Sequence, residues 1–277
     1  MPGRNFHVHL VSDSTGETVS SVARACLVQY EGIFVQEHVW SLVRTKGQME
    51  KVMVEVERNR GPVLYTLVDP ELRDCVRDHC RKLQLPCVGV LDQVMSVLAV
   101  HFHSKSEQWP GRQHQLDEGY FDRIDAMHYT LAHDDGQSTH DLEDADVILV
   151  GPSRTSKTPT CVYLANRGVR AANVPLVPAV PPPVELEAAR RPLVVGLITD
   201  PERLVQIRVN RLRLLQQETE TEYTDMEQVQ LEIQDARRLY ARRKWATIDV
   251  TRRSIEETAA AILQMLSVRR EQRMQAQ

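Results

Sequence analysis

The sequence predicts an α/β protein built on parallel β-sheets, and two features of the chain support that prediction. Short apolar runs rich in Val, Ile and Leu alternate with longer segments in which apolar residues recur at helical spacing. Several of the longer segments start at a Ser, Thr, Asp or Pro, the residues that favour helix N-termini. Strands and helices that alternate in this way form parallel sheets whose two faces are covered by helices.

The N-terminal part of the chain contains four strand–helix pairs. We expect strands at residues 6–11, 33–43, 62–68 and 86–90, and helices at residues 19–29, 46–58, 69–83 and 93–102. A polar segment follows, in which Trp109-Pro-Gly111 breaks regular structure. These features predict an N-terminal parallel-sheet β–α domain at residues 1–105 and a second domain at residues 106–277.

The C-terminal part continues the alternation. We expect strands at residues 146–150, 172–177, 193–198 and 244–250, and helices at residues 117–133, 159–168, 201–215, 226–243 and 255–266. A loop of small and hydroxyl-bearing residues separates the strand 146–150 from the next helix. The second domain is therefore expected to be an α/β domain organised around that loop.

Composition excludes several classes of protein. At 277 residues, with 42% hydrophobic and 26% charged residues, the chain resembles an ordinary soluble globular protein. Its net charge of −4 argues against a nucleic-acid partner. The five cysteines form no Cys-x-x-Cys pair, and we expect reduced thiols in a cytoplasmic protein, since no signal peptide is visible. No apolar run approaches the ~20 residues of a membrane span.

The loop after the strand 146–150 matches a phosphate-binding loop (P-loop), whose pattern is G-x-x-x-x-G-K-[ST]. The one departure is Ser156, which replaces the second glycine. The residues expected to bind a nucleotide or phosphate are Gly151, Pro152, Ser153, Arg154, Thr155, Ser156, Lys157 and Thr158.

The chemistry of phosphate binding explains the residue types of this loop. Backbone N–H groups at a helix N-terminus attract anions, and Lys157 adds a charge for the terminal phosphate. The Thr158 hydroxyl is the expected ligand of Mg²⁺. The alternative is an ordinary strand-to-helix turn with an exposed lysine. Ser156 leaves the loop geometry open, because glycine at that position would take a positive φ freely.

A pair of adjacent carboxylates, Asp134 and Asp135, forms the second candidate for chemistry. Phosphoryl transfer to a hydroxyl needs a carboxylate that accepts the hydroxyl proton, or carboxylates that position Mg²⁺. The pair precedes the P-loop strand closely enough to lie beside the loop. The alternative is a solvated Asp-Asp-Gly turn, and the residues alone leave the two interpretations about equal.

Two further segments have a favoured structural explanation. The loop Ser12–Thr18 lies at the carboxyl end of the first strand, where α/β sheets place ligands, but helix capping by Ser14 or Thr15 explains its composition better. Asp200 could assist Mg²⁺ as a second carboxylate after a buried strand. Because Pro201 follows it, we favour an N-cap for Asp200.

Several segments together resemble the bacterial and plant family of pyruvate, phosphate dikinase regulatory proteins and their phosphoenolpyruvate synthase counterparts. The resemblance covers nearly the whole chain. The segments that carry it are His9-Leu-Val-Ser-Asp-Ser-Thr-Gly-Glu-Thr18, Pro110-Gly-Arg-Gln-His114, Tyr120-Phe-Asp-Arg-Ile-Asp125, His133-Asp-Asp-Gly136, residues 151–159, Arg170-Ala-Ala-Asn-Val-Pro175 and Asp249-Val-Thr-Arg-Arg-Ser-Ile-Glu-Glu-Thr258.

This resemblance implies a bifunctional enzyme. Family members use ADP to phosphorylate a threonine of the target enzyme, and use inorganic phosphate to remove that group as pyrophosphate. By position, Lys157 would stabilise the transferring group, and Asp135 would be the general base in one direction and the general acid in the other. The resemblance also implies a homodimer, with pyruvate, phosphate dikinase as the favoured target and phosphoenolpyruvate synthase as the alternative.

Two positions depart from the family pattern. Pro152 stands where relatives usually have a β-branched residue, and Ala132 stands where some have a lysine. Arg154 or Arg252 could compensate for that missing charge. Two other classes remain as alternatives. One is a P-loop kinase of small molecules or a nucleotide-binding switch, for which no convincing Walker-B strand is visible. The other is a non-catalytic interaction protein, which would leave Lys157 and Asp135 without a role.

Overall fold

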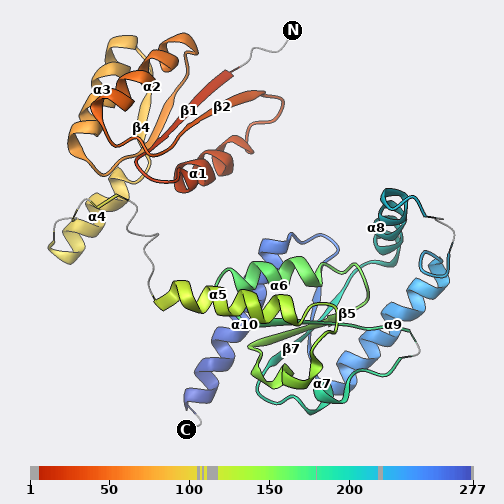
Figure 1. Ribbon diagram of the computed structural model, residues 1–277. Helices are drawn as coiled ribbons and strands as arrows, with labels where there is room; N and C mark the ends of the chain where they lie inside the picture. The colour runs from red at the N-terminus through yellow and green to blue at the C-terminus, as the bar shows by residue number, and fades with distance from the viewer. Residues whose placement is uncertain are drawn as a thin grey trace. The chain divides into compact units, whose positions relative to one another are not determined.

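The computed structural model describes residues 6–104, 107, 109–110, 118–178, 180–217 and 221–275 of the chain. The chain divides into two compact units, residues 1–115 and 116–277, each of which contains a parallel sheet (Figure 1). The predicted α/β class is confirmed. Gly111 of the expected breaker Trp109-Pro-Gly111 lies outside the described residues, as does most of the segment Pro110–His114. No described helix is both long enough and apolar enough to cross a membrane.

The first unit has a four-stranded parallel sheet in the order β2-β1-β3-β4. Its elements follow the predicted order, except that the second strand is shorter than expected and starts only at Val35. The elements are β1 (Phe6–Ser12), α1 (Glu17–Leu27), β2 (Val35–Trp40), α2 (Lys46–Arg58), β3 (Val63–Thr66), α3 (Pro70–Leu83), β4 (Cys87–Gly89) and α4 (Asp92–Phe102).

Helices cover the two faces of this sheet unequally. On one face, α2 and α3 bury side chains such as Met49 and Val76 against Val63 and Tyr65. On the other face, α1 packs Val19 against Leu10 (Figure 1). Helix α4 buries none of its side chains. Its apolar sequence is thus not explained by the core of this unit.

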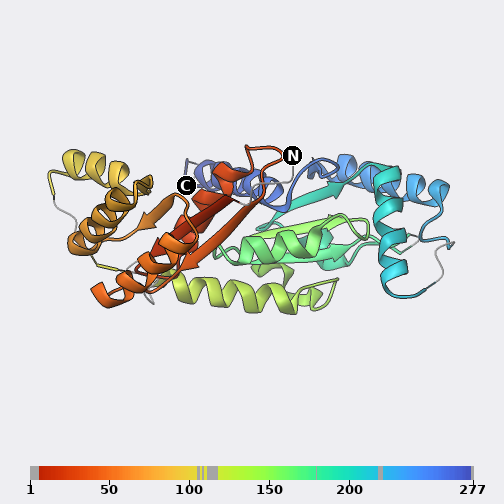
Figure 2. The same cartoon turned by 90° about the horizontal axis from the view of Figure 1, so that it is seen from above.

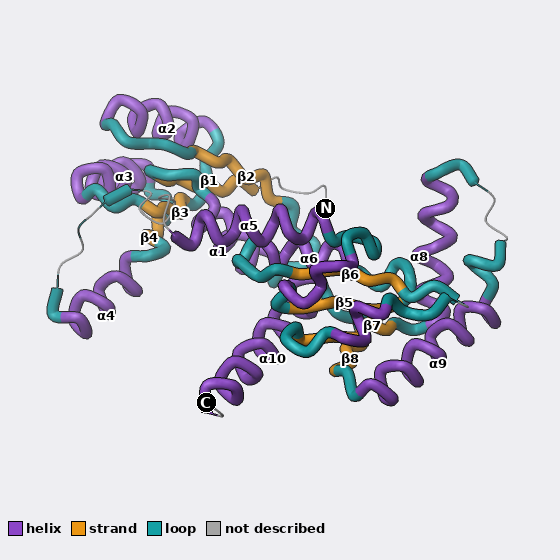
Figure 3. Tube along the Cα trace, turned by 60° about the horizontal axis from the view of Figure 1, so that its bottom comes forward, coloured by secondary structure: helices purple, strands orange, loops and turns teal. Residues whose placement is uncertain are grey.

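The second unit repeats the arrangement, with a parallel sheet in the order β6-β5-β7-β8 (Figure 3). The elements are α5 (Glu118–Ala132), the 3₁₀ helix η2 (Thr139–Asp144), β5 (Val147–Gly151), α6 (Lys157–Ala165), β6 (Ala171–Pro175), α7 (Val184–Ala188), β7 (Leu193–Ile198), α8 (Pro201–Leu214), α9 (Met226–Arg243), β8 (Ala246–Asp249) and α10 (Ile255–Gln275).

The alternation of side chains along β5 explains why this sheet is covered on both faces. Val147 and Leu149 pack with α6 and α10, whereas Ile148 and Val150 pack with η2, α7 and α9. Helix α5 contacts α6 and runs alongside it (Figure 2). Because every residue of β5 is buried, the strand that leads into the P-loop is fixed from both sides.

Two glycines allow Tyr240 of α9 to lie against the carboxyl ends of the central strands. A Cβ at Gly196 would come within 2.4 Å of the Tyr240 ring, and a Cβ at Gly151 would come within 2.6 Å of the Leu197 carbonyl oxygen. The Tyr240 hydroxyl donates to the carbonyl oxygen of Val150 at 3.0 Å. The start of the P-loop therefore rests on a buried tyrosine, whose ring position requires glycine at position 196.

The structure also contains elements that the sequence did not predict. Helix α7 and η2 are each a short segment of five or six residues, too short to show a helical period. Helix α10 extends to Gln275, past the expected end near residue 266. The extension is polar, so no apolar pattern marked it, and its arginines Arg269 and Arg273 donate to the backbone carbonyl of Arg191.

Candidate functional site

The P-loop joins β5 to α6, and Lys157 is the first residue of the helix. Ser156 has a left-handed backbone conformation, with φ 60° and ψ 23°. Arg154 also has a positive φ, of 71°. The position where a glycine was expected thus has the backbone that a glycine would adopt, and the serine adopts it at some conformational cost.

Two side chains of the loop hold the Pro152 carbonyl oxygen by hydrogen bonds. The Pro152 carbonyl oxygen accepts from Thr155 Oγ1 at 2.9 Å and from Lys157 Nζ at 2.8 Å. In a trans peptide the C=O and the following N–H point in opposite directions, and the described chain has no cis peptide. The N–H of Ser153 therefore points away from these two groups.

A cavity of about 280 Å³ opens at this loop. Five of the eight predicted binding residues line it, whereas Gly151, Pro152 and Thr155 form the frame behind them. The lining residues are Asp135, Ser153, Arg154, Ser156, Lys157, Thr158, Pro159, Pro175 and Ile207. Arg154 is thus placed where it could replace the missing lysine of position 132, while Arg252 is not among the lining residues.

Lys157 is the buried charge of this cavity, with 4% of its surface exposed. Burial lowers its pKa to about 8, and the nearby Asp135 carboxylate opposes that shift. Desolvation disfavours the charged form of an amine, and a neighbouring anion favours it. A bound phosphate would therefore restore the full charge of Lys157, so that the lysine binds an anion more strongly than it binds its present backbone partner.

The carboxylate pair lies directly beside the P-loop, held by Asn173 of β6. Asn173 Nδ2 donates to Asp134 Oδ1 at 2.7 Å, to Asp135 Oδ1 at 3.2 Å and to Thr158 Oγ1 at 2.9 Å. The Thr158 hydroxyl in turn donates to Asp134 Oδ1 at 2.9 Å. The segment is also a turn, because Asp135 has φ 50° and Gly136 has φ 76°. The segment is thus a turn that lies beside the P-loop, and its role in proton transfer stays a prediction.

His133 and β6 fix this turn from behind. The Asn173 N–H donates to the His133 carbonyl, and the Gly136 N–H donates to the Asn173 carbonyl. The His133 ring, 3% exposed, stacks on Tyr129 and contacts Asp141 Oδ1 at 2.7 Å. The hydrogen bond from His133 lowers the pKa of Asp141. The two aspartates therefore rest on a rigid support.

The oxygen atoms of Asp134 and Thr158 are a fitting donor set for Mg²⁺. This ion prefers carboxylate and hydroxyl oxygens and normally completes its shell with substrate phosphates and water. Within the described ranges, no cluster of three or more His, Cys, Asp or Glu side chains could hold a metal. Asp200 is instead the N-cap of α8, accepting from the Arg203 N–H at 3.1 Å, so the capping interpretation is confirmed.

The loop Ser12–Thr18 of the first unit does not cap its helix as expected. The N-cap of α1 is Gly16, with φ 84° and no side chain to form a cap, so the expectation of Ser14 or Thr15 at that position is wrong. The loop surrounds a cavity of about 190 Å³. The buried Asp13 accepts from the Val68 N–H at 2.7 Å, and burial raises its pKa.

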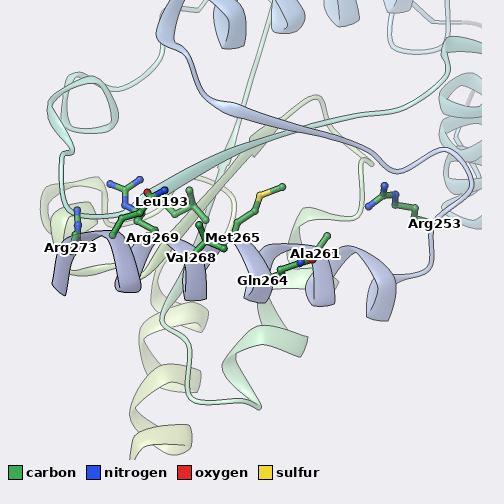
Figure 4. Close-up of a pocket in the computed structure, with 9 residues that line it drawn as sticks. Leu193, Arg253, Ala261, Gln264, Met265, Val268, Arg269 and Arg273 are labelled. Carbon is green, nitrogen blue, oxygen red and sulfur yellow. The ribbon is translucent and has the colours of Figure 1, made fainter. Parts of the chain in front are cut away.

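A larger cavity lies along α10 (Figure 4). It is an open groove of about 890 Å³. Its lining residues are Leu193, Arg253, Ala261, Gln264, Met265, Val268, Arg269, Gln272 and Arg273. None of the predicted site residues belongs to it.

Asn173, Pro175 and Ile207 were not predicted to belong to the site. The first two were visible as part of the segment Arg170–Pro175, whose resemblance to a known family is strong, but no rule gave them a role. Ile207 lies on α8, far along the chain from the P-loop. Only the packing of the domain brings it to the cavity.

A P-loop whose buried lysine faces a carboxylate pair is the arrangement of a phosphotransferase, since that chemistry needs a phosphate cradle and a proton acceptor. The family described as Kinase/pyrophosphorylase matches residues 8–263. The chain belongs to that family.

Close relatives agree over nearly the whole length. A protein of Paramagnetospirillum magneticum is 56% identical over 95% of this chain and 84% of its own length. One of Rhodospirillum rubrum is 53% identical over 96% of this chain and 97% of its own length. One of Caulobacter vibrioides is 53% identical over 95% of this chain and 83% of its own length. All three are provisionally named pyruvate, phosphate dikinase regulatory proteins.

Proposed function

We propose that the protein switches pyruvate, phosphate dikinase off and on by reversible phosphorylation of a threonine. With ADP as donor it would phosphorylate the threonine and release AMP. With inorganic phosphate as acceptor it would remove the phosphoryl group and release pyrophosphate. The observation that carries this proposal is that Asp135, Lys157 and other P-loop residues line one cavity, in a chain of the kinase/pyrophosphorylase family.

One cradle can serve both directions. The β-phosphate of ADP and free phosphate present similar oxygens to the loop N–H groups and to Lys157. In the forward direction the threonine oxygen attacks the β-phosphorus and the bond to AMP breaks. In the reverse direction a phosphate oxygen attacks the phosphothreonine phosphorus, and the bond to the threonine oxygen breaks as pyrophosphate forms.

Asp135 would handle the proton in both directions. Its carboxylate accepts the hydroxyl proton as the threonine attacks, and returns that proton to the threonine oxygen when the phosphoryl group leaves. Asn173 donates to Asp135, which keeps the carboxylate turned toward the cavity. Lys157 would stabilise the negative charge that spreads over the transferring group.

Mg²⁺ would be held by Thr158 and Asp134, whose oxygens are 2.9 Å apart. When bound, the ion neutralises charge on the phosphate oxygens. Thr158 and Asp134 would exchange their mutual hydrogen bond for contacts to the ion. Asn173 Nδ2 would continue to orient the Asp134 carboxylate.

The protein partners follow from relatives rather than from the site. Relatives are named for regulation of pyruvate, phosphate dikinase, and phosphoenolpyruvate synthase is the alternative target. A homodimer is part of the proposal because the family resemblance implies one. The apolar side chains of α4, including Val97, Val100 and Phe102, are exposed and are available for such a contact.

A paired transfer assay tests this function. The protein is incubated with each candidate target and with ADP labelled at its β-phosphate. We expect label on a threonine of pyruvate, phosphate dikinase, and release of labelled pyrophosphate when inorganic phosphate is added. Asp135→Asn should slow both directions by about 10²- to 10⁴-fold, the usual contribution of a general base, while ADP still binds. Transfer from ATP alone, or no transfer to either target, would overturn the proposal.

A further inference from the structure

Arg208 is an unusual residue for the interior of this domain. It lies on α8, is 2% exposed and is among the largest fully buried side chains of the described chain. The neighbouring arginines of the same helix, Arg203 and Arg211, are exposed. Burial of an arginine costs free energy that a pair of apolar side chains would avoid, so its position calls for an explanation.

The contacts of Arg208 lead to the P-loop. Its Nη2 donates to the carbonyl oxygen of Ser153 at 3.2 Å, and its Nη1 donates to the carbonyl oxygen of Tyr223 at 3.0 Å. Glu232 of α9 forms an ion pair with the guanidinium at 2.8 Å. The guanidinium carbon also lies 4.3 Å from the centre of the Tyr223 ring.

Tyr223 makes the second contact with the same loop residue. Its hydroxyl lies 3.2 Å from Ser153 Oγ. The backbone and the side chain of Ser153 are thus both held by one unit, which consists of Arg208, Tyr223 and Glu232. We refer to these three residues as the Ser153 clamp.

We infer that the Ser153 clamp positions the P-loop for phosphate, with Arg208 as its central positioning residue. The reason is the geometry of the peptide that joins Ser153 to Arg154. Because Arg208 draws the Ser153 carbonyl toward itself, the Arg154 N–H of the same trans peptide points in the opposite direction. Ser153 and Arg154 line the cavity, so the clamp presents that N–H to the anion.

The clamp becomes more important once a phosphate is bound. In the structure Lys157 Nζ donates to the Pro152 carbonyl, so the lysine holds the preceding peptide from within the cavity. A phosphate competes for that ammonium group, because an ionised acceptor forms the stronger hydrogen bond. Arg208 has no such competitor, since it is buried outside the cavity lining. It therefore keeps the loop in shape while Lys157 engages the substrate.

The residue types of the clamp fit this role. A guanidinium is planar and offers several donors in fixed directions, so it can hold two carbonyls and a carboxylate at once. Glu232, 8% exposed, neutralises the buried charge. Arg208 Nε has no acceptor in the part of the chain that the structure describes. Arg208 therefore keeps its hydrogen bond to Ser153 although one of its own donors has no acceptor.

This inference rests on the proposed function, and the test separates the two. Binding of ADP and of inorganic phosphate is measured by calorimetry for the wild type, Arg208→Lys, Arg208→Met and Tyr223→Phe. Transfer rates are measured with the target enzyme, and thermal unfolding is followed for each variant. Arg211→Met is the matched control, because it removes an exposed arginine from the same helix.

We expect the variants to weaken the binding of both ligands, and the loss of affinity should increase with the number of contacts that are removed. Arg208→Lys keeps the positive charge but loses the planar guanidinium with its several donors. It should raise the dissociation constants for ADP and phosphate by about tenfold, as expected for a lost hydrogen bond to a charged group. Tyr223→Phe keeps the ring and should raise both dissociation constants by about threefold. Arg211→Met should bind as the wild type does, and the KM for the target protein should be unchanged throughout.

The possible outcomes decide between the two proposals. If the wild type binds neither ADP nor phosphate, the proposed function fails. If the wild type binds both and the folded variants Arg208→Lys and Tyr223→Phe bind and transfer equally well, the clamp has no positioning role. Should Arg208→Met not fold, these two milder variants still provide the test. A loss confined to thermal stability, with unchanged binding and rates, would also overturn the inference.

Discussion

The two units of this protein share one order of strands and differ in the charge at the loop that follows the first strand of each sheet. In each, the first strand lies inside a four-stranded parallel sheet, with the next strand on one side and the remaining two on the other. In each, the loop after that strand ends at a residue with positive φ, Gly16 with 84° and Ser156 with 60°, directly before a helix.

The side chains at these loops diverge at the first helical residue. Thr15-Gly-Glu-Thr18 corresponds in position to Thr155-Ser-Lys-Thr158, so that Glu17 stands where the second loop has Lys157. The first loop adds the buried carboxylate of Asp13, whereas the second faces Asp134 and Asp135 across a buried ammonium. The same turn therefore leads into a helix in both units, but the first helical residue is an acid in the first unit and a lysine in the second.

Removal of the Lys157 ammonium should have the largest effect of the changes that test this difference. Lys157→Ala should lower transfer in both directions by about 10²- to 10³-fold, because one electrostatic contact to the transition state is lost. Glu17→Gln, the change at the corresponding position of the first loop, should leave the chemical step unchanged. Single-turnover rates with labelled ADP measure both variants, and an equal loss in the two would show that the loops are not functionally distinct.

The burial of Lys157 should also appear in the stability of the protein. Its pKa falls from 10.5 to about 8 through burial, so the folded state binds fewer protons than the unfolded state between those values. The contribution of Lys157 to stability should therefore rise as the pH increases from about 8 to 10.5. Below pH 8 the buried ammonium costs about 3 kcal/mol.

Lys157→Met should remove that cost and that pH dependence. The variant is expected to be more stable than the wild type by up to about 3 kcal/mol at pH 7 while it loses activity. Urea unfolding at pH 7, 9 and 10.5 measures the effect. A wild type and a Lys157→Met variant whose stabilities differ by the same amount at all three pH values would show that Lys157 is hydrated rather than buried.

The smallest expected effect concerns the residue with positive φ in each loop. Ser156→Gly should stabilise the protein by about 1 kcal/mol, because glycine adopts the left-handed conformation without strain. Gly16→Ala should destabilise it by a similar amount. A Cβ at Gly16 meets only Val39 Cγ1 at 3.4 Å and more distant atoms, so its cost is conformational. Equal stability of all three proteins would mean that the loops relax to other conformations.

The sequence predicted most of the fold because its signals are local. Alternating apolar segments located all eight strands that the structure describes, and helices α2 and α9 have the predicted bounds. The short helix α7 and the polar end of α10 gave no such signal. The capping of α1 was mispredicted, because Ser14 and Thr15 look like caps in any sequence, whereas the loop is folded around a cavity.

The sequence predicted the loop and the carboxylates of the candidate site, but not the residues that orient them. Short segments of the chain contain both signals, which are the spacing from Gly151 to Thr158 and the adjacent pair Asp134 and Asp135. The partners that orient them, Asn173 and Arg208, come from other strands and helices, and no periodicity or motif links them to the loop. Their roles arise from contacts between residues that are distant in sequence.

By itself, the sequence determined the parallel α/β class, the phosphate loop and the types of residue available for proton transfer, since each depends on neighbours along the chain. The tertiary structure alone decided that Asn173 joins Thr158 to both aspartates and that Lys157 is desolvated. It also decided that a buried arginine holds the loop. Hydrogen-bond direction and burial depend on which surfaces pack together, and packing is a property of the folded chain.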